Sequence, residues 1–299
     1  MLLAAFDGEK YIKEQLDSIF QQSGCDVIDV FVRDDCSRDG TSEVLKNYSL
    51  KKDALKVLEA DSNTGKAGFN FYELIRYVPP DYDYYAFADQ DDIWMPDKLA
   101  SAVNLLQGSG SECYSCAVEA FWPDGRTSIL KQNPRQLPAD AFFEAAGQGC
   151  TYVFTQAFFV RLQDFVRSHA SEIAKFEFHD WLAYVLSRAW GSKWYFDPVP
   201  HMRYRQHDNN ELGARGGWKS IANRLRKIRS GWYKGQIVMA SDIYIAAGGG
   251  DKSALDLRSS CVNSSAKFSA KSICLLMRYS RRRVVDRVVI VFSHLMRWI

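Results

Sequence analysis

Three aspartates crowd one short segment of the sequence, Ala88 to Trp94, where Asp89, Asp91 and Asp92 flank a single glutamine. Carboxylates at this spacing repel one another strongly, so a bound cation would stabilise them. Oxygen ligands with room left for diphosphate oxygens suit Mg²⁺ or Mn²⁺, and such an ion neutralises a departing nucleotide diphosphate. The alternative is a solvated acidic loop, which is disfavoured because the tryptophan that follows indicates a packed, shaped site.

Two further carboxylates stand where chemistry could occur. Asp35 follows a predicted strand and precedes a turn rich in Ser, Asp, Gly and Thr. It can accept hydrogen bonds from a nucleobase N–H or from ribose hydroxyls. Asp180 opens a predicted helix close behind two phenylalanines, where it could act as a general base for an acceptor hydroxyl. Its alternative is an ordinary helix N-cap, because aspartate is favoured there.

The elements that must position these residues alternate strands with helices, the pattern of a parallel sheet covered by helices. Strands are predicted at Met1 to Phe6, Val27 to Asp34, Leu55 to Glu59, Tyr84 to Ala88, Glu112 to Phe121 and Cys150 to Thr155. Helices are predicted at Tyr11 to Gln22, Thr41 to Tyr48, Phe69 to Val78, Pro96 to Gln107, Ala157 to Ser168 and Asp180 to Ala189. Ligands of an open parallel sheet bind beyond the carboxyl ends of its strands, so the polar residues that follow these strands are the binding candidates.

Composition narrows the class of protein. The 299 residues carry 38 basic and 36 acidic side chains, a formal charge of +2, so no global field indicates a nucleic-acid partner. Seven scattered cysteines, an odd count, favour a reducing compartment over a disulfide framework. No apolar stretch is long enough to span a membrane and no secretory signal opens the chain. We therefore expect a cytoplasmic protein, with peripheral contact at the inner face of the membrane as one option.

The last predicted helix repeats apolar residues along two adjacent lines and is flanked by arginines. The lines are Val284, Val288, Val291 and Leu295, and Val285, Val289, Phe292 and Met296. Such a helix could lie in an anionic membrane interface. It could equally pack on the preceding domain with its arginines in solvent, and the sequence leaves both interpretations open.

The motifs taken in order resemble glycosyltransferase family 2 with the GT-A fold, most closely its bacterial rhamnosyltransferase-like branch. The matching segments are Ala4 to Ile12, Glu14 to Ile19, Asp34-Asp35, Asn63 to Gly65, Asn70-Phe71, Asp89 to Trp94, Gly149 to Thr151, His179 to Trp181 and Tyr204 to His207. The resemblance covers about residues 1 to 215. It implies an α/β nucleotide-diphospho-sugar transferase fold, a mostly parallel sheet between helices. Beyond it, the residue pattern itself turns helical and predicts a helical extension at 216 to 299.

The resemblance implies a nucleotide site on the first strands. Asp35 matches the family residue that holds the nucleobase, with the backbone near Ala5 and Asp7 beside it. The Phe6-Asp7 pair replaces the usual Tyr-Asn of the branch, which is expected to alter base or ribose contacts. Lys66 stands in a turn where the branch has small residues, so it is expected either to reach the diphosphate or to face solvent.

The resemblance also implies a metal and catalytic centre. Asp89 and Asp91 match the family's D-x-D pair, which places Asp89 toward the ribose and metal and makes Asp91 the main metal ligand. His207 matches an additional metal or diphosphate contact. Asp180 falls at the position of the catalytic base, which activates an acceptor hydroxyl for in-line attack with inversion at the anomeric carbon.

The expected function is an inverting, Mg²⁺- or Mn²⁺-dependent glycosyltransferase that uses dTDP-rhamnose to extend a glycan or lipid-linked saccharide in cell-surface polysaccharide synthesis. Two alternatives remain: a UDP-hexose donor on the same fold, and a non-catalytic partner protein that binds sugar nucleotides. A nucleotidyltransferase is disfavoured, because Asp7-Gly8-Glu9 is not a glycine-rich basic phosphate loop. Since the sequence begins within the first strand, Met1 is expected to be an internal start or the start of a shortened chain.

Overall fold

The computed structural model describes residues 1–207, 226, 228–261 and 269–299. The chain divides into two compact units. The first comprises Met1–Gln132, Ala146–Asp180 and the described part of Ser192–Asn210. The second comprises Asn133–Ala145, Trp181–Gly191 and the described part of Glu211–Ile299.

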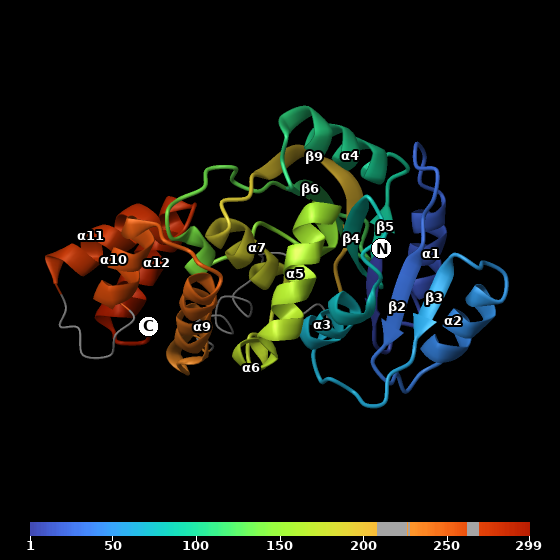
Figure 1. Ribbon diagram of the computed structural model, residues 1–299, viewed down its shortest axis with the longest axis horizontal. Coiled ribbons are helices and arrows are strands. Elements are labelled where there is room, and N and C mark those ends of the chain that lie inside the picture. The colour runs from blue at the N-terminus through green and yellow to red at the C-terminus, as the bar shows by residue number, and fades with distance from the viewer. Residues whose placement is uncertain (208–225, 227, 262–268) are drawn as a thin grey trace. The chain divides into compact units, whose positions relative to one another are not determined.

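The predicted parallel strands at the start of the chain are confirmed (Figure 1). The strands are β1 (Leu2–Ala5), β2 (Val30–Asp34), β3 (Leu55–Leu58) and β4 (Tyr84–Asp89). All three pairings among them are parallel, in the order β3-β2-β1-β4. The register sets Ala4 opposite both Arg33 and Asp89, so the aspartates that follow β2 and β4 lie at the same edge of the sheet.

Helices cover both faces of this sheet, which explains why β1, β2 and β4 read as largely apolar runs. On one face, Leu3, Val32 and Ala88 belong to a core that also contains the inward residues of three helices. These are α1 (Ile12–Phe20), α2 (Thr41–Ser49) and α4 (Lys98–Ser109). On the other face, α3 (Ala67–Tyr77) and α5 (Gln156–Ser168) cover β4 through ring pairs. Tyr85 stacks on Phe159 at 3.7 Å between centroids, and Phe71 contacts Phe87 at 5.2 Å.

The rest of the sheet is mixed. It continues through β8 (Val153–Thr155), β6 (Cys113–Phe121), β9 (Trp194–Arg205) and β5 (Ile93–Trp94), and β7 (Thr127–Leu130) pairs with β6. Only the β6–β9 pairing is parallel in this half. The strand predicted from Cys150 is wrong over its first residues, because Gly149–Thr151 forms a 3-10 turn, η2, closed by a hydrogen bond from the Tyr152 N–H to the Gly149 carbonyl.

Four longer helices dominate the described part of the second unit after residue 230, in line with the predicted helical extension. They are α9 (Trp232–Ala246), α10 (Lys252–Cys261), α11 (Ala270–Tyr279) and α12 (Val284–Leu295). The unit also holds the 3-10 turn η1 (Asp140–Phe142) and most of α7 (His179–Ala189). The short helix α6 (Ala170–Ile173) belongs to the first unit. Among the helices described, none is both long and apolar enough to cross a bilayer.

Hydrogen bonds to two acids join the segment Asn133–Ala145 to α7 and to the turn between α11 and α12. The Glu144 carboxylate accepts bonds from the Arg281 guanidinium at 3.1 Å and from the Arg282 backbone N–H at 2.6 Å. Asp140 is fully buried and accepts bonds from the Tyr184 hydroxyl at 2.7 Å and the Arg188 guanidinium at 3.0 Å. Because a buried carboxylate without such partners would be costly, these contacts fix the segment within the second unit.

Candidate active site

The loop between β4 and β5 carries the acidic cluster and is braced by its glutamine. The Gln90 side-chain amide accepts from the Phe6 N–H and donates to the Phe6 carbonyl, both at 2.8 Å. A Cβ added to Gly8 would lie 2.2 Å from the Gln90 Oε1, so only glycine leaves room for this side chain. The bracing holds the ends of β1 and β4 together where the aspartates emerge.

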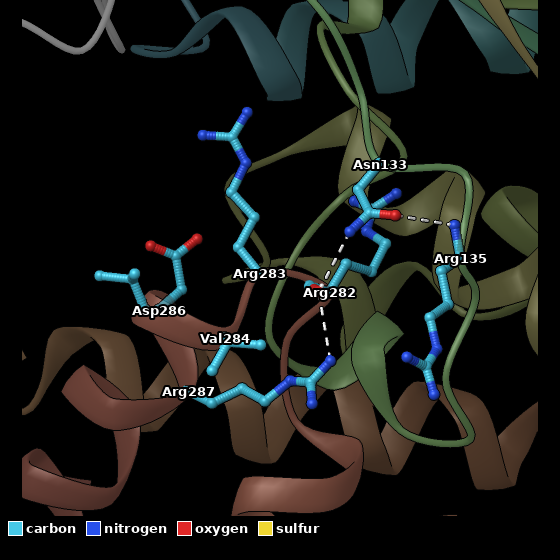
Figure 2. Close-up of a pocket in the computed structure, with 8 residues that line it drawn as sticks. Asn133, Arg135, Arg282, Arg283, Val284, Asp286 and Arg287 are labelled. Carbon is cyan, nitrogen blue, oxygen red and sulfur yellow. Dashed lines mark hydrogen bonds between the residues drawn. The ribbon is translucent and has the colours of Figure 1, made fainter.

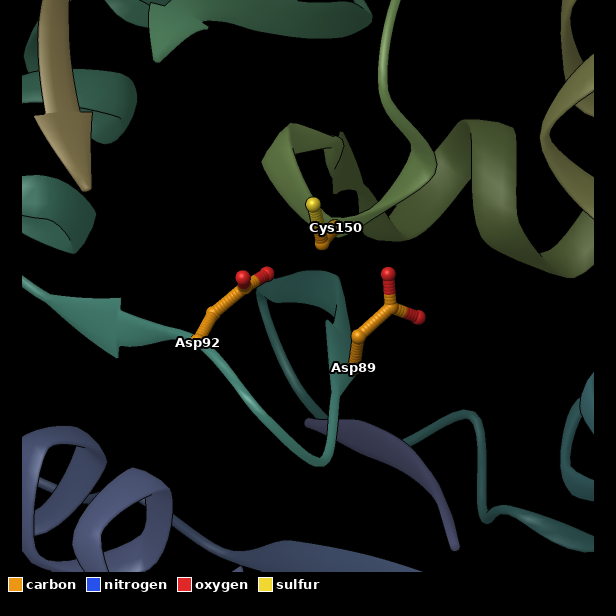
Figure 3. A group of neighbouring side chains, drawn as sticks. All are labelled: Asp89, Asp92 and Cys150. Carbon is orange, nitrogen blue, oxygen red and sulfur yellow. The ribbon is translucent and has the colours of Figure 1, made fainter. Parts of the chain in front are cut away.

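The three aspartates of the loop have different environments. Asp92 is fully buried and accepts a hydrogen bond from the Arg205 N–H at 3.1 Å. Burial, and then the charges of Asp91 and Asp89, raise the pKa of Asp92 well above its usual value. Asp89 and Asp92 converge with the Cys150 thiol from η2, and their ligand atoms all lie within 4.8 Å of one another (Figure 3). Asp92 therefore favours its neutral form, while Asp89 and Asp91 keep partial contact with solvent.

Asp91 meets His207, although 116 residues separate them in the chain. The Oδ2 of Asp91 lies 2.6 Å from the Nε2 of His207, and both side chains are half-buried. The His207 ring stacks on Tyr11 with centroids 5.7 Å apart. Asp91 and His207 thus present a carboxylate oxygen and an imidazole nitrogen at one point, with Asp89 on the same loop.

Arg205 organises this corner, a role that the residue pattern did not predict. Its Nε donates to the Asp91 carbonyl at 2.8 Å, and an Nη donates to the Glu14 carboxylate at 2.5 Å. Its guanidinium also lies over the Tyr11 ring, 4.4 Å from the centroid. The signal was present, because Arg205 stands two residues before His207 in a segment that resembles the family. What the sequence lacked was the pairing of β9 with β5 that brings it to the acidic loop.

The predicted base-binding residue Asp35 is almost completely buried and engaged within the protein. Its carboxylate accepts bonds from the Arg33 guanidinium at 2.7 Å, from the Thr64 N–H at 2.8 Å and from the Thr64 hydroxyl at 2.8 Å. The Ala5 carbonyl accepts a bond from the Asp35 N–H at 2.8 Å. Asp35 thereby ties the end of β2 to β1 and to the turn at Thr64. A nucleobase would have to share or displace one of these bonds, and its binding here stays a prediction.

Two more of the predicted nucleotide contacts, Asp7 and Lys66, also have protein partners. Asp7 accepts bonds from the Arg38 backbone N–H at 2.8 Å and from the Arg38 guanidinium. Hydrogen bonding by Arg38 lowers the pKa of Asp7, so Asp7 stays charged. Lys66 precedes α3, and its ammonium lies 2.5 Å from the Glu177 carboxylate. Whether Lys66 reaches a diphosphate from there stays a prediction.

The turn η2 links the acidic cluster to Asp180. Its Cys150 contacts the aspartates, while its Gly149 packs against the start of α7, where an added Cβ would lie 2.8 Å from the Asp180 Cβ. The neighbouring His179 stacks on Phe71 with centroids 3.6 Å apart, and burial lowers its pKa to about 3. His179 is therefore a neutral packing residue that fixes the start of the helix. The structure thus places Asp180 directly behind the turn that holds Cys150 against Asp89 and Asp92.

Comparisons with known proteins identify the class to which this fold and site belong. Residues 2–165 match the family described as Glycosyl transferase family 2. Among solved structures, S. aureus TarS in complex with UDP superimposes with a TM-score of 0.56 at 17% identity, covering 99% of this chain and 90% of that one. The mannosyltransferase PcManGT from Pyrobaculum calidifontis, in complex with GDP-Man and Mn²⁺, gives a TM-score of 0.53 at 15% identity, covering 99% and 85%. These two structures share the GT-A-like fold with this chain.

A sequence relative adds to this assignment. The chain is 38% identical over 237 residues to the dTDP-rhamnosyl transferase RfbG of Shigella flexneri, which covers 79% of this chain and 82% of that protein. The chain therefore belongs to glycosyltransferase family 2 and is a glycosyltransferase. The predicted family and fold class are both confirmed.

Proposed function

We propose that this chain transfers a sugar from a nucleotide diphosphate donor to an acceptor hydroxyl with inversion and with the help of a divalent metal. The observation that carries the proposal is the contact of 2.6 Å between Asp91 and His207 at the acidic edge of the sheet. Two functional groups from distant strands converge there beside further carboxylates, which is how a site for a cation and a diphosphate is built. The donor we propose is dTDP-rhamnose, and the support is the 38% identity to a dTDP-rhamnosyl transferase.

The residues at this corner fit a divalent cation. Asp91 and His207 would hold it, with Asp89 beside them toward the ribose. Burial, and then repulsion by Asp91 and Asp89, raises the pKa of Asp92, and a positive charge at this corner would relieve the repulsion. Mg²⁺ and Mn²⁺ both accept carboxylate oxygens. When bound, the metal would neutralise charge on the departing nucleotide diphosphate.

Asp180 supplies the base in this proposal. Its carboxylate takes the proton of the acceptor hydroxyl while that oxygen forms a bond to the anomeric carbon. The bond from the anomeric carbon to the diphosphate oxygen breaks on the opposite side, and the nucleotide diphosphate leaves with the bonding electron pair. Attack from the opposite side inverts the configuration at the anomeric carbon. The rigid start of α7, packed against Gly149, supports a base held in a fixed place.

Asp35, Ala5 and Asp7 would receive the nucleoside, and Lys66 would approach the diphosphate. The acceptor we propose is a glycan or a lipid-linked saccharide of cell-surface polysaccharide synthesis. The cytoplasmic location expected from the cysteine count belongs to the same proposal.

A substitution at Asp180 tests the reaction. We expect Asp180→Asn to abolish sugar transfer while nucleotide binding is retained, because the amide binds in the same space but cannot take a proton. Asp164→Asn, an exposed aspartate on α5, is the matched control and should keep the wild-type rate. Transfer that survives Asp180→Asn would remove the base assignment.

A thermal-shift panel tests the donor. UDP-, dTDP- and GDP-sugars are compared with and without Mn²⁺ or Mg²⁺. A ligand at roughly a hundredfold excess over Kd stabilises the folded protein by about 2.7 kcal/mol. We expect the largest shift with dTDP-rhamnose and metal together. A larger shift with a UDP-hexose would replace the proposed donor, and no shift with any sugar nucleotide would overturn the proposal.

A further inference from the structure

The helix α12 exposes its apolar side chains and buries polar ones. Seven apolar residues at this helix are between 39% and 75% exposed. They are Val284, Val285, Val288, Val289, Phe292, Leu295 and Met296, and we call them the α12 apolar face. The buried side of the helix carries Arg287, Ile290, Ser293 and His294. This is the reverse of a helix on a protein surface in water, whose apolar side faces the core.

Hydrogen bonds on the buried side keep the helix in this orientation. The Arg287 guanidinium donates to the carbonyls of Met277 and Arg282, each at 3.2 Å, and to the carbonyl of Arg281. A rotation of α12 that buried the apolar face would break these bonds and leave a buried charge without partners, which is costly. The exposure of the apolar face is therefore a fixed feature of the second unit.

Basic residues border the apolar face. Arg283 precedes the helix and Arg297 follows it, and both are exposed. At the start of the helix lies a cavity of about 670 Å³ whose charged lining consists of four arginines and one aspartate. Figure 2 shows Arg135 on one side of this cavity and Arg283 and Val284 on the other. We call it the arginine pocket, and its lining residues are Asn133, Arg135, Arg282, Arg283, Val284, Val285, Asp286 and Arg287.

We propose that α12 lies in the plane of an anionic lipid bilayer, with the α12 apolar face among the acyl chains and the arginine pocket against lipid phosphates. The 12 residues of the helix extend only about 18 Å, less than the roughly 30 Å of a hydrocarbon core, so the helix lies along the surface. Val284 and Val285 belong to both the α12 apolar face and the arginine pocket. A single phospholipid could therefore contact both surfaces at once.

Charge favours a lipid surface over a second copy of the chain. Two α12 helices packed antiparallel through their apolar faces would bring Arg283 of one copy near Arg297 of the other, and like charges repel. An anionic bilayer meets both arginines with phosphates instead, each worth about fivefold in binding. The proposal goes beyond sugar transfer and needs neither donor nor acceptor for its test.

Vesicle co-sedimentation of the full chain tests it. We expect binding to vesicles of phosphatidylcholine with phosphatidylglycerol, weaker binding to phosphatidylcholine alone, and a decrease as salt is added. The variant Val285→Glu/Phe292→Glu should lose binding by more than about tenfold. Its matched control is Leu50→Glu/Val199→Glu, because those residues are 76% and 50% exposed against 75% and 51% for the tested pair. The control should bind as the wild type does.

A second variant, Arg135→Gln/Arg283→Gln, tests the contribution of charge. It should weaken binding to the anionic vesicles about fivefold per arginine. Unchanged melting temperatures verify that the variants fold. Equal binding to neutral and anionic vesicles would overturn the proposal, as would wild-type binding by Val285→Glu/Phe292→Glu. A dimer that forms without lipid and dissociates in that variant, measured by sedimentation velocity, would overturn it in favour of a second copy. Loss of sugar transfer alone would not bear on it.

Discussion

Replacing Gly149 by alanine tests whether η2 sets the position of Asp180. The added Cβ would lie 2.8 Å from the Asp180 Cβ and 2.9 Å from the His179 Nε2, whereas ordinary contact begins at 3.4 Å. His179 cannot retreat easily, since its ring stacks on Phe71. Either the start of α7 or the turn itself must therefore move, by about 0.6 Å if ordinary contact is to be restored.

This displacement should slow the chemistry while the protein stays folded. A misplacement of about 1 Å costs roughly a hundredfold in rate, so a shift of this size in Gly149→Ala is expected to lower kcat about 10- to 100-fold. Crowding in a packed site costs about 1–3 kcal/mol of folding stability, which leaves a folded protein at assay temperature. Donor KM should change little, because the proposed nucleoside contacts Ala5, Asp7 and Asp35 lie at the ends of β1 and β2, away from η2.

The assay is release of nucleoside diphosphate at saturating donor, with folding checked by circular dichroism. Gly108→Ala is the matched control, because its added Cβ meets no atom within 4 Å, and a helical glycine replaced by alanine gains up to about 1 kcal/mol. It should keep the wild-type rate and melt no earlier. A Gly149→Ala enzyme that is folded and turns over at the wild-type rate would refute the argument that η2 positions Asp180.

Three further predictions concern the metal, a histidine and a close backbone approach. Asp91→Asn should raise the Mn²⁺ concentration for half-maximal activity at least about tenfold, measured by titration after chelation; an unchanged requirement contradicts the ligand role. The hydrogen bond to Asp197 raises the pKa of His201. The contribution of protonated His201 to folding stability is therefore full below about pH 6.5 and is lost as the pH rises through the raised pKa. The melting temperature of His201→Gln should thus lie further below that of the wild type at about pH 5.5 than at about pH 9. An equal difference in melting temperature at the two pH values contradicts this. Gly68→Ala would set a Cβ 1.9 Å from the Glu177 carbonyl oxygen and should cost at least about 1–3 kcal/mol in urea unfolding; wild-type stability contradicts it.

The first half of the sheet could be predicted from the sequence because its signals are local. Strands β1, β2 and β4 are buried on both faces, so they appear as largely apolar runs. The apolar residues of the helices between them recur at the helical period instead. An order of alternating strands and helices allows few topologies. The aspartates that follow β2 and β4 were therefore correctly placed at strand ends before any contact was known.

Other features depend on pairings between distant segments, which leave no local trace. The strand β9 contains Pro198 and Pro200 and does not read as a strand, yet it pairs in parallel with β6 along most of its length. That pairing and the contact with β5 carry Arg205 and His207 to the acidic loop. Sequence spacing did not indicate His207 as a site residue, and only the family resemblance did.

Burial decided the chemical character of residues that look alike in sequence. Asp91 and Asp92 are neighbours of the same type, but β5 and Arg205 enclose Asp92 while Asp91 turns toward His207. The apolar lines of α12 were also evident in the sequence, which left open whether the helix lies in a membrane interface or packs on the preceding domain. Within the second unit, the buried bonds of Arg287 hold the α12 apolar face outward, because the free energy of burying a charge depends on partners that only the folded chain supplies.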